Sequence, residues 1–389
     1  MTNDILIRNV RPMGGAPVDI RIHDGTVTEM ADGILPAHGE EMVEGAGRLA
    51  LPGLINAHTH LDKTRWGLPW QPHAAGPDRE ERIAADRDTR DALLPSVKDR
   101  AAALVRQCVA MGTSHIRTHV DVEPKQGLAA VEPLLTMADE MRSEVDLDLV
   151  AFPQFGVMTN PGTAEMMEQA VRAGAAGVGG IDPSSIDGDP AGQLDAVFTI
   201  AERTGAGIDI HLHETGEEGA RSMAMICERT GALGMAGRVA ISHAFCLGTV
   251  DDAREAELIE QLAKCGVAVV TYAPGKAPIP PLKVLRDAGV TVAVGTDGIR
   301  DAWTPYGNGD MLERAMMLAY RSDFRRDEDI ELALDAVISG GADLLGLERH
   351  GVQVGAPGDL VLIGAETVAE AVVARPQART VIKRGRQVG

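Results

Sequence analysis

Between residues 53 and 294 the chain alternates short apolar runs with longer, Ala-rich stretches that have helical periodicity. Eight of the short runs predict strands, at Gly53–Ala57, Ser114–Val120, Leu147–Phe152, Gly177–Ile181, Gly207–His211, Val239–His243, Ala268–Thr271 and Val290–Val294. Apolar strands that alternate with helices are typical of a parallel sheet covered by helices. Eight such units predict an α/β fold, a (β/α)8 TIM barrel, whose chemistry lies at the carboxyl ends of its strands.

The two ends of the chain carry a different pattern, in which apolar and polar positions alternate between turn residues. This pattern covers residues 5–10, 18–22 and 25–30, with a hairpin turn at His23-Asp24-Gly25, and it returns at 359–364 and 379–388. Alternation with period two predicts antiparallel strands. We therefore expect residues 1–51 and 352–389 to form one small β-sandwich beside a barrel at 52–351.

Composition and charge narrow the range of partners. The chain has 389 residues, 44% of them hydrophobic and 24% charged, which is ordinary for a soluble globular protein. Its formal net charge of −20 disfavours phosphate backbones and anionic membranes. We expect neither nucleic acid nor a membrane as a partner, but a neutral or cationic small molecule.

The cysteines and the amino-terminal residues indicate in which cellular compartment the protein is expected. Cys108, Cys227, Cys246 and Cys265 lie far apart and form no Cys-X-X-Cys pair, so neither disulfides nor a thiolate zinc site is predicted. The first residues lack the basic and then apolar form of a signal peptide. These features predict a cytoplasmic protein with reduced thiols, which we expect to be a homo-oligomer.

Candidate chemistry begins directly after the first predicted barrel strand, with His58 and His60. Side chains alternate between the faces of a strand, so both imidazoles point the same way. Most His-X-His pairs bind nothing, but His211 and Asp297 follow later strands at the same end of the barrel. Histidines with one carboxylate suit Zn²⁺ or Fe²⁺. We predict His58, His60, His211 and Asp297 as metal ligands.

The strand Leu147–Phe152 limits the number of metal ions. It is followed by Pro153-Gln154 and supplies no lysine or carboxylate that could bridge two metals. A single divalent ion, Zn or Fe, is therefore expected as cofactor. Such an ion lowers the pKa of a bound water to near 7 and supplies hydroxide at neutral pH.

A proton carrier is needed as well, because an amine leaves a tetrahedral carbon only after protonation. Glu214, three residues beyond His211, is a candidate carrier, and His213 is a second one. Asp297 is predicted to take the first proton of the water and His243 to orient it. His213 could instead cap a helix or face solvent.

Several motifs resemble the amidohydrolase superfamily and, within it, the cytosine deaminase-like branch. They are Pro52–Asp62, Arg117–Asp121, Val150–Gln154, Asp209–His211, Ser242-His243 and Gly295–Asp297. The resemblance spans residues 52–310 and implies a mononuclear hydrolytic deaminase of a nitrogen heterocycle, with Gln154 and Trp303 contacting the substrate. Other segments resemble the branch's isopropylaminohydrolases, and they add Asp182 and Lys63 to the candidate substrate-binding residues.

Two of these positions carry alternatives, and a third position departs from the family pattern. Lys63 could donate to a ring carbonyl, pair with Asp62 or face solvent, and Trp303 could stack on a planar ring or lie in the core. Cytosine deaminases of the branch have a second aspartate at position 298, where this chain has Gly298. Glycine removes a polar anchor there and predicts a bulkier or differently substituted ring than cytosine.

Together these features predict a metal-dependent hydrolytic deaminase. Its substrate would be a nitrogen heterocycle such as cytosine, isocytosine, a pterin or an s-triazine-like ring, from which an exocyclic amino or alkylamino group is removed. One alternative is a hydrolase that opens a cyclic amide or imide. Another is a non-catalytic protein that keeps the fold to bind partners.

Overall fold

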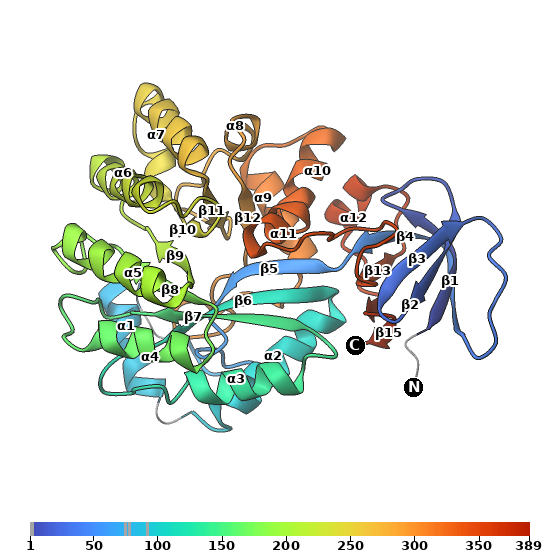
Figure 1. The fold of residues 1–389 in the computed structure, drawn as a ribbon, viewed down its shortest axis with the longest axis horizontal. Helices are drawn as coiled ribbons and strands as arrows, with labels where there is room; N and C mark the ends of the chain where they lie inside the picture. Colours follow the sequence, from blue (N-terminus) through green and yellow to red (C-terminus); the bar gives the residue numbers. More distant parts are fainter. Residues whose placement is uncertain (1–3, 74–75, 77–78, 91–92) are drawn as a thin grey trace.

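The fold is that of a computed structural model, which describes residues 4–73, 76, 79–90 and 93–389 (Figure 1). Its larger sheet has eight parallel strands in sequence order. They are β5 (Leu54–Thr59), β6 (Thr113–Asp121), β7 (Asp146–Phe152), β8 (Gly177–Ile181), β9 (Gly207–His211), β10 (Val239–Ser242), β11 (Val267–Thr271) and β12 (Val292–Val294). All eight predicted barrel strands are present, and the predicted α/β barrel is confirmed.

The barrel closes where the residues that follow β12 pair with the end of β5. The amide of Asp297 donates to the carbonyl of His58 at 2.9 Å, and Thr59 and Asp297 form an isolated parallel bridge. This closure places a carboxylate from the end of the sheet beside the histidines from its beginning.

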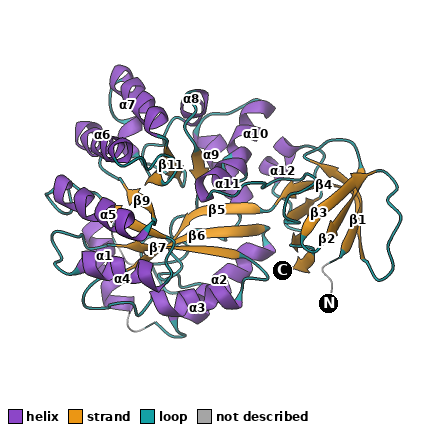
Figure 2. Cartoon of the chain, viewed as in Figure 1, coloured by secondary structure: helices purple, strands orange, loops and turns teal. Residues whose placement is uncertain are grey.

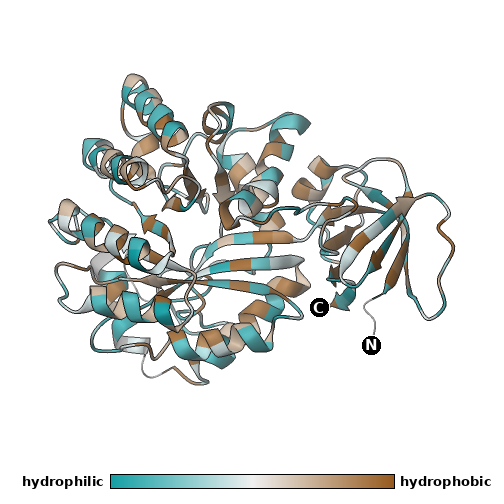
Figure 3. Ribbon diagram, in the orientation of Figure 1, coloured by the Kyte–Doolittle hydropathy of each residue, from teal (hydrophilic) through white to brown (hydrophobic). Residues whose placement is uncertain are grey.

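Helices cover the outside of the barrel (Figure 2). They are α1 (Arg79–Arg90), α2 (Val97–Ala110), α3 (Val131–Glu140), α4 (Thr163–Ala173), α5 (Pro190–Thr204), α6 (Gly216–Ala232), the 3₁₀ turn η1 (Phe245–Gly248), α7 (Asp252–Cys265), α8 (Leu282–Asp287), α9 (Met311–Arg321), α10 (Asp327–Asp335) and α11 (Ser339–Leu345). Hydrophilic and hydrophobic residues alternate along them (Figure 3). Their buried apolar residues join those of the strands in one large core. Among the described residues, no helix is long and apolar enough to cross a membrane.

Both ends of the chain build the second sheet, as predicted. Its order is β15-β14-β13-β4-β1-β2-β3. The bounds are β1 (Ile5–Pro12), β2 (Val18–His23), β3 (Thr26–Ala31), β4 (Glu41–Pro52), β13 (Leu360–Ile363), β14 (Arg379–Lys383) and β15 (Arg386–Val388), with helix α12 (Val368–Ala374) after β13. Asp24 and Gly25 have φ of 47° and 74°, the two positive values that a type I′ hairpin turn requires.

Two details of this sheet differ from the prediction. Strand β4 was not predicted, and it pairs with β1 in parallel rather than antiparallel. The segment 379–388, predicted as one strand, is a hairpin that turns at Arg384-Gly385. The strands form a single hydrogen-bonded sheet, and apolar residues from both of its halves meet in one core, among them Ile7, Ile20 and Leu362.

A cavity of about 440 Å³ lies at the amino ends of strands β8 to β12. Bulky branched residues usually fill this part of a TIM barrel. Here small residues such as Gly207, Ala240 and Ala268 leave the space open, and Arg117 and Asp209 also line it. The cavity is at the opposite end of the barrel from the predicted chemistry.

Candidate active site

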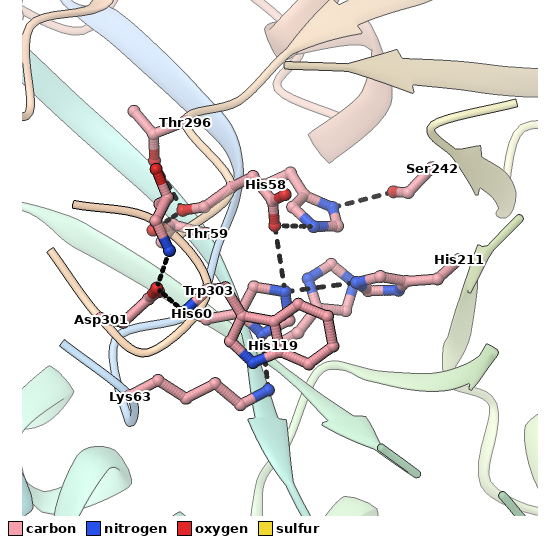
Figure 4. A network of polar contacts seen from close by, with 12 residues as sticks. His58, Thr59, His60, Lys63, His119, His211, Ser242, Thr296, Asp301 and Trp303 are labelled. Atoms are coloured by element: carbon pink, nitrogen blue, oxygen red, sulfur yellow. Dashed lines mark hydrogen bonds and ion pairs between the residues drawn. The ribbon is translucent and has the colours of Figure 1, made fainter. Parts of the chain in front are cut away.

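Five buried histidines, four of them labelled in Figure 4, converge at the carboxyl ends of the barrel strands. His58 lies in β5 and His60 just after it, while His119, His211 and His243 come from β6, β9 and the end of β10. The Nε2 atoms of His60 and His211 are 3.3 Å apart. One nitrogen from each of His58, His60, His119 and His211 lies within 4.8 Å of the others, and His58, His243 and Asp297 form a second such group.

The four predicted ligands therefore lie together, and a divalent cation fits them. Asp297 Oδ1 is 3.6 Å from His58 Nε2 and 3.4 Å from His60 Nε2. Within the described residues, His58 Nε2, which faces Asp297, is buried without a hydrogen bond. An unpaired buried polar atom costs about 1–3 kcal/mol, which a bound cation would offset.

Burial also favours the metal-binding form of these histidines. It lowers the pKa of His60 and His211 well below the ordinary value, and the positive charge of Lys63 adds to this effect at His60. Neutral imidazole is the form that donates a lone pair to a metal. Asp297 stays ionised, because the imidazoles of His58 and His60 lower its pKa by more than burial raises it.

His119 was not among the predicted ligands, but its ring centroid is 4.2 Å from that of His58. Its Nε2 is 3.6 Å from Asp209 Oδ2, and within the described residues neither ring nitrogen makes a hydrogen bond. The site thus offers one more imidazole than a set of four ligands needs. The strand-end position of His119 was the only signal in the sequence.

His58 is oriented by two polar residues from neighbouring strands. Its Nδ1 is 2.9 Å from Ser242 Oγ, and Ser242 donates to Asp209 Oδ1 at 2.6 Å. A partner on one ring nitrogen fixes the tautomer and leaves the other nitrogen for a ligand. Asp209 also approaches Arg117 at 3.7 Å, so its buried charge is compensated. Neither Ser242 nor Asp209 was assigned a role from the sequence.

Lys63 is buried, with 3% of its surface exposed. Its Nζ is 2.8 Å from Asp121 Oδ1, 2.8 Å from Gln154 Oε1 and 3.5 Å from His60 Nδ1. Burial lowers its pKa, but the carboxylates of Asp121 and Asp62 outweigh this and raise it. A permanent ammonium therefore lies next to the histidine cluster, and the solvent-exposed alternative is wrong.

The two candidate proton carriers have different surroundings. Both oxygens of Asp182 accept hydrogen bonds from His213, at 2.6 Å from its amide and 2.9 Å from Nδ1. The His213 ring stacks on His243, with centroids 4.2 Å apart, and 29% of its side chain is exposed. His213 is thus fixed in orientation and still accessible.

Glu214 instead binds the neighbouring loop. Its Oε1 accepts from the amides of Ser184 and Ser185 at 2.7 and 2.9 Å, and its Oε2 accepts from Ser222 Oγ at 2.6 Å. Burial raises the pKa of Glu214, while these hydrogen bonds act in the opposite direction. Both of its oxygens are therefore engaged away from the histidine cluster.

Strained backbone marks the same region. Asp182, His243 and Asp297 have φ of 36°, 74° and 57°, values that residues other than glycine rarely adopt. Such conformations cluster at functional sites, where the surrounding structure enforces them. Trp303 lies in the same loop as Asp297, after β12, and its amide donates to Asp301 Oδ1 at 2.8 Å (Figure 4).

The chain is thus a parallel eight-stranded barrel with histidines and a carboxylate at its carboxyl end that could hold a metal ion. The model of the Amidohydrolase family matches residues 80–389, and the chain belongs to this family. The predicted superfamily and its cytosine deaminase-like branch are confirmed. The protein is an enzyme that acts on carbon–nitrogen bonds, and the alternative of a non-catalytic protein is set aside.

Two solved structures and one curated relative are similar over nearly the whole chain. N-isopropylammelide isopropylaminohydrolase from Burkholderia multivorans ATCC 17616 is 46% identical with a TM-score of 0.95, over 99% of this chain and 97% of that one. The 5-methylcytosine deaminase of Klebsiella pneumoniae is 27% identical with a TM-score of 0.88, over 99% and 97%. N-isopropylammelide isopropyl amidohydrolase from Pseudomonas sp. (strain ADP) is 30% identical over 358 residues, 89% of this chain and 87% of the relative.

Proposed function

We propose that the protein is a metal-dependent hydrolytic deaminase that removes an exocyclic amino or alkylamino group from a small nitrogen heterocycle. The observation that carries this proposal is the convergence of His58, His60, His211 and Asp297 beside the oriented imidazole of His213. The relatives named for N-isopropylammelide and 5-methylcytosine support a ring with an exocyclic nitrogen as substrate.

We assign His58, His60, His211 and Asp297 as the ligands of one divalent ion, with His119 as a further donor. These residues would hold a Zn or Fe ion, which would supply a water molecule with a pKa near 7 as the nucleophile. The ionised carboxylate of Asp297 accepts the first proton of that water. His243, which shares the second ligand group with His58 and Asp297, orients the attacking water.

His213 is the better proton carrier. Asp182 accepts from Nδ1, so a proton that this imidazole takes up is carried on Nε2, from which it passes to the leaving nitrogen. Glu214 has both oxygens bound to Ser184, Ser185 and Ser222, which argues against a role at the reacting carbon. Asp182, fully buried against His213, then positions that imidazole rather than contacting substrate.

Lys63 and Gln154 form the polar end of the proposed substrate pocket. The Lys63 ammonium lies 2.8 Å from Asp121 and Gln154 but 3.5 Å from His60 Nδ1, and we propose that a ring carbonyl of the substrate accepts its third hydrogen bond in place of this long contact. Trp303, in the loop after β12, is proposed to stack on the planar ring.

Amine release from a panel of aminopyrimidines, pterins and amino- or alkylamino-triazines tests the activity. We expect His213→Asn to lower kcat by about 10²- to 10⁴-fold, the usual worth of a general acid or base. Glu214→Gln is the matched control and should change kcat by less than about tenfold. A larger effect of Glu214→Gln would make Glu214 the carrier, and no amine from any ring would contradict the proposal.

We further propose a division into residues 1–51 with 352–389 and a catalytic barrel at 52–351, a homo-oligomeric state, and a cytoplasmic location without nucleic-acid partners. The high net negative charge and the spacing of the cysteines support the last of these.

A further inference from the structure

The space beside Gly298 is filled by another side chain of the same loop. A Cβ atom placed on Gly298 would overlap Asp301 Oδ2 and would lie 2.9 Å from Asp301 Cγ. Gly298 directly follows Asp297, the proposed ligand. The carboxyl group of Asp301 therefore occupies the position that a side chain at 298 would take.

Only one oxygen of this carboxyl group makes hydrogen bonds within the loop. Asp301 Oδ1 accepts from the amides of Trp303 and Thr304 at 2.8 and 2.9 Å. Asp301 is 2% exposed, and within the described residues its Oδ2 is buried without a hydrogen bond. An asparagine would cap the turn equally well through its carbonyl oxygen. The structure of the loop therefore does not require the second oxygen, Oδ2. Burying this oxygen without a hydrogen-bond partner costs free energy.

The loop that carries Asp301 is anchored to the segment that carries Lys63. Thr64, next to Lys63, donates from Oγ1 to the carbonyl of Ile299 at 2.9 Å, and the amide of Arg65 donates to the carbonyl of Arg300 at 2.7 Å. Figure 4 draws Asp301 and Lys63 in the same close view as His60. An acceptor and a donor are therefore fixed relative to each other on one rigid unit.

We propose that Asp301 is a specificity-determining residue that replaces the side chain missing at position 298. Its Oδ2 accepts a hydrogen bond from an N–H of the substrate, while Lys63 donates to a ring carbonyl. This inference rests on the proposed deaminase function and concerns how its pocket recognises an N–H of the substrate ring. Burial raises the pKa of Asp301 to about 7, in keeping with an oxygen that lacks a partner until substrate binds.

The direct test compares an amino-oxo ring with its N-methyl analogue, in which the ring N–H is blocked. The wild-type enzyme should lose about 10- to 100-fold in kcat/KM on N-methylation, the cost of one lost polar contact. Asp301→Ala and Asp301→Asn should lower kcat/KM for the parent ring by a similar factor, chiefly through KM. Both variants should lose most of the discrimination against the N-methyl ring.

Gly298→Ala provides an independent test that leaves Asp301 in the chain. Gly298 lacks a positive φ, so alanine there conflicts only with the Asp301 carboxyl group. The substitution should raise KM in the wild-type background and have no further effect in Asp301→Ala, because both changes remove the same contact.

The outcomes separate this inference from the proposed function. Equal discrimination by wild type and Asp301→Asn, or strictly additive effects of Gly298→Ala and Asp301→Ala, would overturn the role of Asp301. Metal content and melting temperature of Asp301→Asn serve as the check on folding. Absence of amine release by the wild-type enzyme would instead overturn the deaminase proposal itself.

Discussion

At the scale of single residues, the orientation of His58 depends on a buried polar relay. His58 Nδ1 meets Ser242, Ser242 donates to Asp209, and Arg117 and His119 approach the other oxygen of Asp209. Burial acts to raise the pKa of Asp209, but its cationic and imidazole neighbours hold it below the ordinary range. The relay keeps His58 in one tautomer with Nε2 toward Asp297.

Ser242→Ala and Asp209→Asn should therefore weaken metal binding. Loss of a residue that orients a metal-binding histidine typically lowers metal affinity by about 10- to 100-fold, and we expect a loss in this range for both variants. Competition with a chromogenic chelator measures the change. Ser222→Ala is the matched control, because Ser222 is equally buried but bonds to Glu214. Unchanged affinity in Ser242→Ala would show that the relay does not position His58.

The sequence predicted which side chains enter the site better than it predicted what they contact. His58 and His60 followed from strand alternation alone. The choice between His213 and Glu214 did not, because Glu214 is held by amides of residues 29 and 30 positions away. No role for Asp301 was predicted from the sequence, for a similar reason. The conformation of the loop brings the Asp301 carboxyl group against Gly298, and the sequence does not specify that conformation.

At the scale of elements, buried ion pairs join the terminal sheet to the barrel. Lys383 of β14 is 1% exposed and lies 2.7 Å from both Asp359 and Asp146, the latter at the start of β7. Arg379 of β14 makes a bidentate pair with Asp310, the residue that caps α9. Loss of one partner leaves the other charge buried and unpaired.

Lys383→Met should lower the free energy of unfolding by about 3–5 kcal/mol, as expected when one partner of a buried pair is removed. Lys283→Met removes a pair of similar length, Lys283–Asp329 at 2.7 Å, whose lysine side chain is 56% exposed. That control should leave the free energy of unfolding nearly unchanged, because solvent screens an exposed ion pair. Urea unfolding measures both, and equal effects would contradict the importance of the interface.

The terminal sheet also marks the limit of prediction at this scale. Strand β4 contains Gly45 and Gly47 and several charged positions, so it lacks the alternation that identified its neighbours. Its pairing is set by β1 on one side and by β13, over 300 residues away, on the other. Local pattern carries no information on either contact.

At the scale of the whole molecule, stability should fall on acidification because of groups between the two sheets. Burial lowers the pKa of His350 to about 4, and His115 adds to this. The unfolded chain binds a proton at the ordinary value of about 6.5, so stability is lost as the pH falls from about 6.5 to 4. Asp146, whose pKa His115 and Lys383 hold low against the effect of burial, adds a further loss below about pH 4.

His350→Gln keeps a donor for the carbonyl of Gly53, which His350 Nε2 approaches at 2.8 Å, but does not titrate. The wild-type protein should lose about 1–3 kcal/mol more than this variant between pH 7 and pH 4. Parallel pH profiles of the two unfolding free energies would exclude His350 as the cause.

The barrel as a whole was predictable, but its interior was not. Eight apolar strands in regular alternation with helices indicate a TIM barrel. The cavity of about 440 Å³ at the amino ends of the strands arises from small residues, such as Gly207 and Ala268, that different strands bring together. Their coincidence in one layer depends on the strand register, which apolar patterning does not specify.

The central claim is that water replaces an exocyclic amine on a ring carbon with the help of one divalent ion. Reaction in ¹⁸O-water, followed by mass spectrometry of the product, tests it most directly. We predict one ¹⁸O in the ring product and one equivalent of free amine, both lost on chelation and restored by Zn²⁺ or Fe²⁺. A product that gains a whole water and keeps its exocyclic nitrogen would identify ring opening and contradict the account.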